Sequence, residues 1–306
     1  MFYICYRLTS GHPVIGKEYL PSWRQIDVTV ITKRLEVVSV KPRVQKFKVR
    51  SKKDAKECSI TDICRMSSGQ HVVIDYSNRN AKLLGDGFKI LSRHEFKSWP
   101  RCVAVTSHED VSVTVGELDK PGEVHILGTG NGKLKLIKKM KMEHFCHGIA
   151  HFDKYTYIAS RDALYKYIMK DQLIGKIYED APCGPYSFSV NKICVTGNGE
   201  KLYVSDWRHN RLVVLDNQGE TRQTFVPDDD ILSGTSGVAV TSDERVYLCG
   251  FSTKNVMEVF PGCAEDMRLV AGEADGIQSP NALIADDLRK TLTVVQSNDF
   301  LYVIRL

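Results

Sequence analysis

The chain has 306 residues, with 42 Lys and Arg against 37 Asp and Glu, a formal net charge of +5, and 42% hydrophobic and 26% charged residues. This is the composition of an ordinary soluble globular protein, which excludes a disordered or collagen-like chain. No stretch reaches the roughly 18 uncharged apolar residues that a membrane-spanning helix needs, so no membrane partner is predicted.

The first 42 residues carry an alternating run at Ile26, Val28 and Val30 and prolines at positions 13, 21 and 42. Alternation is typical of a short strand, and proline interrupts strands. We interpret residues 1–42 as an N-terminal extension that is partly irregular. The run from Val44 to Ser51 alternates regularly and predicts a lone strand that precedes the rest of the chain.

A branched apolar residue after a polar or glycine step recurs six times after this strand. These anchors lie 40, 46, 44, 45 and 45 residues apart and are Ile63, Val103, Ile149, Ile193, Val238 and Leu283. Short turns follow three of them, at Ser67-Ser68-Gly69, Gly197-Asn198-Gly199 and Ser242-Asp243-Glu244. Such a period is that of a four-stranded propeller blade. The sequence predicts an all-β fold, a six-bladed β-propeller over residues 43–306.

The last copy ends in FLYVIRL and is one strand short of a blade. The spare strand from Val44 to Ser51 would complete it by pairing with Phe300 to Ile304. We expect this N-terminal outer strand to close the ring, because closure hides sheet edges that would otherwise aggregate.

The nine cysteines form no CxxC pair, and Cys64, Cys194 and Cys249 lie inside apolar strand-like runs. A reduced thiol in such a run behaves as a small hydrophobic group. We therefore expect buried free thiols rather than disulfides or a zinc site. Free thiols are typical of a reducing compartment, which predicts a cytoplasmic protein.

Two repeats carry a further motif. It consists of Asp75-Tyr76 followed by Asn78 and Leu83-Leu84, and of Asp206-Trp207 followed by Asn210, Val214 and Leu215. Together with the GVAV and KLYVSDW segments of the repeats, this motif resembles the NHL-type (TolB-like) six-bladed propeller, especially the C-terminal domain of tripartite-motif (TRIM) proteins. From the residues alone, we expect the two aspartates to accept backbone N–H groups at strand-to-strand turns.

The resemblance implies a non-catalytic module that binds a protein partner, as in the substrate-binding part of a TRIM-like ubiquitin ligase. The RING finger and B-boxes of such ligases need a ladder of cysteine and histidine ligands, and this sequence has none. The resemblance leaves open whether the chain is a stand-alone propeller or part of a longer ligase.

Polar residues stand two positions before every anchor, where the innermost strand of each blade would face the central channel. The six are Thr61, Arg101, His147, Asn191, Ser236 and Asn281. Polar side chains are expected at the mouth of a wet channel, and they also offer contacts to a ligand or partner. Trp207 and Arg208 follow a strand and add an aromatic and a cationic group. We predict a partner-binding site of Arg101, His147, Asn191, Trp207, Arg208, Ser236 and Asn281.

A metal-dependent, lactonase-like hydrolase is one alternative for this ring. A calcium site needs converging oxygens that include carboxylates. Asp62, the only nearby carboxylate, is one residue out of phase and is expected to point the other way on its strand. Neither GxSxG, a P-loop nor HExxH occurs. We therefore predict no catalytic residues, no metal ligands and no small-molecule cofactor.

Single-stranded RNA is the other alternative partner, because NHL propellers of the TRIM class include RNA binders. Arg101, Lys192 and Arg208, with His209 and Arg211, supply cationic groups near the predicted channel mouth. The lysines between positions 133 and 141 fit a solvated edge strand better. A net charge of +5 is mild for a nucleic-acid binder, so a protein partner is the first hypothesis and RNA the second.

Overall fold

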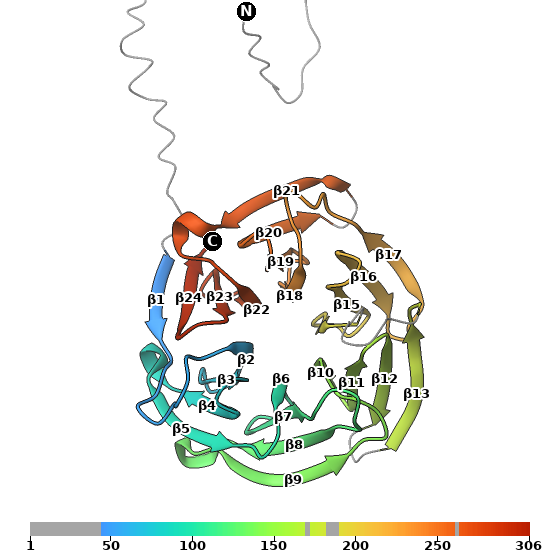
Figure 1. Cartoon of the computed structure of the whole chain (residues 1–306). Helices are drawn as coiled ribbons and strands as arrows, with labels where there is room; N and C mark the ends of the chain where they lie inside the picture. The colour runs from blue at the N-terminus through green and yellow to red at the C-terminus, as the bar shows by residue number, and fades with distance from the viewer. Residues whose placement is uncertain (1–43, 169–171, 182–189, 261–262) are drawn as a thin grey trace, which may run out of the picture. The chain divides into compact units, whose positions relative to one another are not determined.

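A computed structural model describes residues 44–168, 172–181, 190–260 and 263–306. These residues form six four-stranded antiparallel sheets arranged as blades around a central axis (Figure 1). The prediction of an all-β six-bladed propeller is confirmed. The predicted extension, residues 1–42, lies outside the described residues. The described ranges contain no α-helix. They contain three short 3₁₀ turns, at Asp86–Phe88, Gly130–Gly132 and Glu273–Asp275.

Each of blades 1 to 5 uses four consecutive strands, from the innermost to the outermost. Blade 1 contains β2 (Ile60–Arg65), β3 (His71–Asp75), β4 (Asn80–Leu84) and β5 (Ile90–Glu95). Blade 2 contains β6 (Pro100–Val105), β7 (Asp110–Val115), β8 (Glu123–Gly128) and β9 (Lys135–Lys141). Blade 3 contains β10 (Ile149–Phe152), β11 (Tyr155–Ser160), β12 (Ala163–Ile168) and β13 (Gln172–Glu179). Blade 4 contains β14 (Lys192–Val195), β15 (Lys201–Asp206), β16 (Arg211–Asp216) and β17 (Thr221–Phe225). Blade 5 contains β18 (Thr235–Val240), β19 (Val246–Gly250), β20 (Asn255–Phe260) and β21 (Cys263–Ala271).

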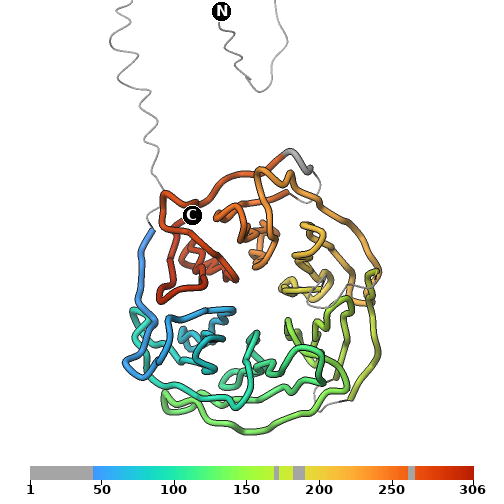
Figure 2. The backbone as a smooth tube through the Cα atoms, viewed as in Figure 1, coloured from blue at the N-terminus to red at the C-terminus, as the bar shows by residue number. Residues whose placement is uncertain are grey.

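Blade 6 is assembled from both ends of the propeller. It contains β22 (Pro280–Asp286), β23 (Thr291–Gln296), β24 (Phe300–Arg305) and, as its outer strand, β1 (Val44–Lys48). The pairing runs from Val44 opposite Ile304 to Lys48 opposite Phe300. The backbone tube shows the blue first strand beside the red last one (Figure 2). The predicted closure is confirmed.

The closing strand is shorter than the sequence predicts, because it ends at Lys48 rather than Ser51. The N–H of Val49 donates to the backbone carbonyl of Asp299 (2.8 Å), and the Val49 carbonyl accepts a hydrogen bond from Lys82 of blade 1. The chain therefore leaves blade 6 at this point and crosses to blade 1.

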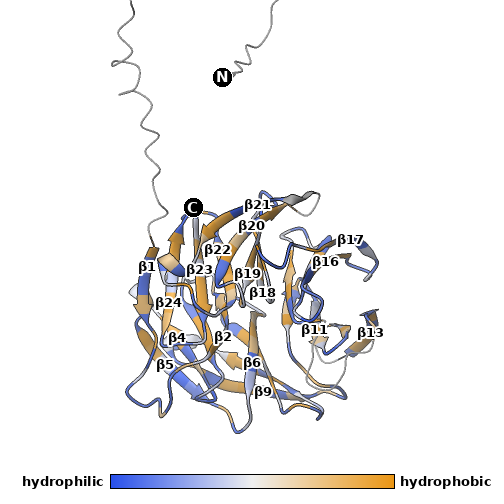
Figure 3. Cartoon of the chain, turned by 45° about the horizontal axis from the view of Figure 1, so that its top comes forward, coloured by the Kyte–Doolittle hydropathy of each residue, from blue (hydrophilic) through white to orange (hydrophobic). Residues whose placement is uncertain are grey.

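The hydrophobic core is divided among the six gaps between blades. Each of six clusters of buried apolar side chains draws on two neighbouring blades. A middle strand is thus covered on both faces, which explains why all residues of β3 and β4 are buried. The outer strand β9 is mostly exposed and carries the lysines predicted for an edge strand. Coloured by hydropathy, the strands carry apolar residues along much of their length (Figure 3).

The predicted turns and free thiols are also present. Gly69 and Gly199 have positive φ angles (85° and 73°), and a Cβ atom on Gly199 would lie 2.1 Å from the ring of Phe152. Cysteines with free thiols among the described residues are Cys58, Cys64, Cys102, Cys146, Cys194 and Cys249. Within the same residues, no helix has the length and apolar character to cross a membrane.

Candidate recognition site at the channel mouth

A cavity of about 630 Å³ opens at one end of the channel, here called the mouth. Its lining residues come from all six blades and are Thr61, Tyr76, Arg101, His147, Asn191, Lys192, Trp207, Arg208, Ser236 and Asn281. All seven residues of the predicted site are among them, with Thr61 of the same predicted ring. The repeat register thus places one polar residue per blade at this end of the channel.

Four ring residues connect neighbouring blades. Their side chains each donate a hydrogen bond to a backbone carbonyl of the next blade. The bonds run from Thr61 Oγ1 to Arg101 (2.7 Å), His147 Nδ1 to Asn191 (3.2 Å), Ser236 Oγ to Pro280 (2.7 Å) and Asn281 Nδ2 to Ile60 (2.8 Å). The polarity of the ring therefore has a structural cause at these four positions.

Arg101 and Asn191 differ from these four residues. Both are buried at the mouth, and neither side chain has a hydrogen bond to a neighbouring backbone among the described residues. The Arg101 guanidinium lies near two aromatic rings, with its Cζ atom 4.8 Å from the ring centroid of Phe145 and 5.6 Å from that of Tyr76. Burial lowers the pKa of Arg101, and its interaction with the Tyr76 hydroxyl opposes that lowering.

His147 is neutral at physiological pH. Burial lowers its pKa to about 3, and the positive charges of Arg101 and Lys192 contribute to the lowering. Because Nδ1 of the imidazole donates to the Asn191 carbonyl, that nitrogen is not available as a base toward the Thr61 or Ser236 hydroxyl. The imidazole here holds two blades together, as a buried hydrogen-bonded histidine does.

The rim of the mouth is aromatic. Trp207 is 38% exposed and packs against Phe251 of blade 5, with ring centroids 4.9 Å apart. Tyr76 lines the cavity but is not in the predicted set. The signal for it was available, since Tyr76 follows Asp75 at the position where Trp207 follows Asp206.

The expectation that Asp62 points away from the channel is wrong. Asp62 and Lys192 line a second cavity of about 250 Å³, further along the channel, and their charged atoms lie 3.3 Å apart. Lys192 also donates to the carbonyl of Thr61 (2.8 Å) and the sulfur of Cys102 (2.9 Å). The sheets stand radially, so both faces of an innermost strand border the channel, and alternation does not separate inward from outward residues.

The other cations predicted near the mouth are paired. Arg211 contacts Asp206 through Nε (2.6 Å) and Asp180 through its terminal nitrogen, and His209 Nδ1 contacts Asp206 (2.8 Å). Asp206 also accepts the backbone N–H of His209 (3.0 Å), as predicted for a turn carboxylate. The ligand atoms of Asp180, Asp206 and His209 lie within 4.8 Å of one another. Arg211 already supplies the positive charge that a metal ion would bring.

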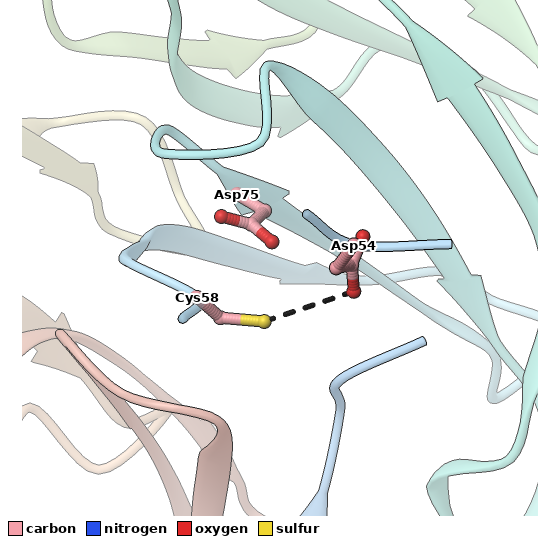
Figure 4. Close-up of side chains that lie close together, drawn as sticks. All are labelled: Asp54, Cys58 and Asp75. Atoms are coloured by element: carbon pink, nitrogen blue, oxygen red, sulfur yellow. Dashed lines mark hydrogen bonds between the residues drawn. The ribbon is translucent and has the colours of Figure 1, made fainter. Parts of the chain in front are cut away.

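A second cluster lies where the chain crosses from blade 6 to blade 1, here called the seam. Figure 4 shows Asp54, Cys58 and Asp75 with their side chains together. The ammonium of Lys82 donates to both carboxylates (2.8 Å each), to the Cys58 sulfur (3.2 Å) and to the Val49 carbonyl (3.0 Å). A protein cation therefore takes the position that a metal ion would need.

The charges at the seam stabilise one another. Burial alone would lower the pKa of Lys82, but its hydrogen bonds to Asp54 and Asp75 raise it above the usual value. Burial alone would raise the pKa of Asp54, but the Lys82 hydrogen bond and the Ser51 N–H hold it below the usual value. Asp75 also accepts the N–H groups of Ser59 (3.2 Å) and Asn78 (3.3 Å), as predicted.

The mouth offers hydrogen-bond donors, positive charge and aromatic surface. Among its described lining residues there is no carboxylate, and the hydroxyls of Thr61 and Ser236 donate to backbone carbonyls. A divalent cation there would meet Arg101, Lys192 and Arg208 without an acidic ligand, which does not suit calcium. The chemistry of the lining suits the binding of a partner rather than metal-assisted hydrolysis.

Comparison with solved structures supports the fold. A Bacteroides thetaiotaomicron protein of unknown function has a TM-score of 0.69 at 11% identity, covering 86% of this chain and 76% of that chain. An auxiliary nutrient binding protein from the same organism has a TM-score of 0.64 at 10% identity, with the same coverages. A catalytically inactive histidine-to-alanine variant of virginiamycin B lyase from Staphylococcus aureus, with quinupristin, has a TM-score of 0.61 at 10% identity, covering 86% and 100%.

These likenesses establish the propeller fold and nothing of the function, because the identities are so low. No protein-family model and no curated protein sequence matches the chain. The coarse resemblance, to a six-bladed propeller, is confirmed, whereas the narrower likeness to NHL-type propellers rests on the sequence motifs alone.

Proposed function

We propose that the mouth is a recognition surface for a protein partner and that the chain performs no chemistry of its own. The observation that carries this proposal is the rim, where an exposed tryptophan and an arginine stand beside a cavity of about 630 Å³. Trp, Tyr and Arg are the residues at which binding energy concentrates in protein interfaces. The Thr61 and Ser236 hydroxyls serve blade-to-blade hydrogen bonds, which supports binding without catalysis.

The test compares two pairs of substitutions at opposite ends of the channel. The mouth variant is Trp207→Ala with Arg208→Ala. Its control is Leu288→Ala with Arg289→Ala, in the β22–β23 turn, where Leu288 is 91% exposed. We expect the mouth variant to weaken capture of the wild-type chain's protein partners by about tenfold or more. The control should not, and both variants should keep a cooperative unfolding transition, with a lower midpoint in the mouth variant because the Trp207–Phe251 contact is lost. Equal capture by both variants would overturn the proposal.

The same capture experiment, repeated with nuclease and at two salt concentrations, distinguishes an RNA partner from a protein partner. A cationic mouth with aromatic groups also suits stacked bases. Binding to RNA falls steeply with salt because phosphate contacts release counterions. Capture that survives nuclease treatment and changes little between low and physiological salt supports the protein partner. Capture lost under both conditions makes RNA the partner.

The resemblance to TRIM-type propellers supports a finer proposal, in which the mouth selects substrates for ubiquitin transfer performed by another domain or subunit. Its support is the motif shared by Asp75-Tyr76 and Asp206-Trp207. Incubated with ubiquitin-activating and ubiquitin-conjugating enzymes, the chain alone should not become ubiquitinated. Autoubiquitination would overturn this division of labour, and a lactonase activity lost on chelation would instead favour a hydrolase.

A further inference from the structure

Arg101 is a buried cation whose guanidinium has no acidic partner among the described residues. It is the second residue of β6, lines the mouth and is 8% exposed. No described carboxylate pairs with it, and its Nε atom is buried without a hydrogen-bond partner in the described chain. Charged groups are rarely buried unless they are paired and hydrogen-bonded. Arg101 is thus an exception that calls for an explanation.

The charged residues near Arg101 do not neutralise it. The two other cations that line the mouth are Lys192, which pairs with Asp62 at 3.3 Å, and Arg208, which would repel rather than neutralise a guanidinium. Phe145 and Tyr76 lie within cation–π distance of the guanidinium. The Tyr76 hydroxyl also interacts with the guanidinium, but neither Tyr76 nor Phe145 supplies the negative charge that would neutralise it.

The planar geometry and single charge of the Arg101 guanidinium indicate which ligand it would bind. A guanidinium donates through a planar fork that matches a carboxylate, with two parallel N–H···O bonds. A singly charged carboxylate balances one unpaired positive charge, whereas a phosphate dianion would bring twice as much. The Asn191 amide, which lines the same cavity and makes no side-chain hydrogen bond within the described residues, offers one further donor.

We infer that the mouth receives an acidic side chain, aspartate or glutamate, of the protein partner and holds its carboxylate on Arg101. The inference rests on the proposed function and specifies what the recognition surface reads. Arg101 is the anchor inside the cavity, and Trp207 and Arg208 contact the partner around it at the rim.

The test measures carboxylate preference directly on the full chain. The probes are fluorescent nine-residue peptides with amidated C-termini, degenerate except for a central glutamate, glutamine or phosphoserine. We expect the wild-type chain to bind the glutamate pool about tenfold or more tightly than the glutamine pool. Arg101→Met should lower binding of the glutamate pool to that of the glutamine pool. The control Arg289→Met, at the opposite end of the channel, should keep the preference.

A thermal unfolding measurement distinguishes an anchor from a structural residue. Arg101→Met removes a buried charge that has no counterion, so the melting temperature should stay the same or rise. A residue kept for folding would instead lower it. Three results would overturn the inference: no preference for glutamate in the wild type, a preference that survives Arg101→Met, or tighter binding of the phosphoserine pool.

Failure of this inference and failure of the proposed function give different results. If Trp207 and Arg208 are needed for partner capture but the glutamate and glutamine pools bind equally, the mouth is still the recognition surface, and carboxylate binding by Arg101 is overturned. If capture is indifferent to the rim, the proposed function itself fails, whatever the peptides show.

Discussion

Lys82 at the seam and Arg101 at the mouth are both buried cations, only 19 positions apart in sequence, and their surroundings are opposite. Lys82 is fully buried and contacts two carboxylates, a thiol and a carbonyl. Arg101 is also buried but faces aromatic rings and a cavity, with no described carboxylate beside it. A buried charge with its partners in place serves the fold, whereas one that lacks them marks a position where a partner is to be supplied from outside.

The largest effect should come from removing the closing strand, which also contributes one hydrogen-bond acceptor to the seam. Deleting residues 1–51 removes β1 and the Val49 carbonyl, so that β24 loses its neighbour and Lys82 one of its acceptors. We expect the cooperative unfolding transition to be lost or to fall steeply in temperature. Deletion of residues 1–40, which keeps β1, is the control. If both truncated chains melt at the same temperature, closure by β1 does not stabilise the propeller, and the structural role assigned to the seam is contradicted.

A single substitution at the seam should have the next largest effect. Lys82→Met leaves the buried Asp75 carboxylate without a cation and leaves Asp54 with Arg93 alone, 3.4 Å away. Breaking a buried pair in this way costs about 3–5 kcal/mol. The free energy of unfolding, measured in urea, should fall by that amount. Adding Asp75→Asn should restore part of it by removing the carboxylate that has lost its cation. A loss no larger than that of Arg101→Met would erase the distinction between the two cations.

The smallest effect concerns the pH dependence of His147 at the mouth. Its pKa of about 3 is lowered by burial first and by the charge of Arg101 next. Arg101→Met should therefore raise the pKa of His147, although burial keeps it below the usual value. A lowered histidine pKa contributes stability above pH 6.5 that is lost as the pH falls. The variant should thus lose less stability than the wild type between pH 6.5 and 4.

Titration of His147 by NMR checks this prediction, with Arg289→Met as the control. An unchanged His147 pKa in Arg101→Met would mean that the charge of Arg101 is already neutralised. The mouth would then resemble the seam, and the contrast between the two cations would disappear.

The propeller and its mouth were predictable because the repeat fixes both. A period near 45 residues identifies six blades, and the same register places one residue per blade at the channel, from Thr61 to Asn281. The seam was not predictable in this way. Lys82 lies 28 positions from Asp54 and 24 from Cys58, and these partners belong to the crossing segment, which has no counterpart in the other repeats.

Asp62 shows why orientation was harder to predict than position. Alternation along a strand assigns side chains to two faces of a sheet, but not to the inside or outside of a ring. Because the blades stand radially, both faces of β2 reach the channel, and Asp62 meets Lys192 there. The missing counterion of Arg101 was equally hidden, since the absence of a partner becomes visible only when all neighbours are known.

The pairing of β1 with β24 also determines when the ring can form during synthesis. Lys48 and its partner Phe300 are 252 positions apart, so the first strand of the propeller leaves the ribosome long before the strand it pairs with. Contacts of such long range are formed slowly, and an unpaired strand edge is open to association with other chains in the meantime. The exposed Lys46 and Lys48 on β1 place positive charge on that waiting strand, which discourages neighbouring copies from docking on it.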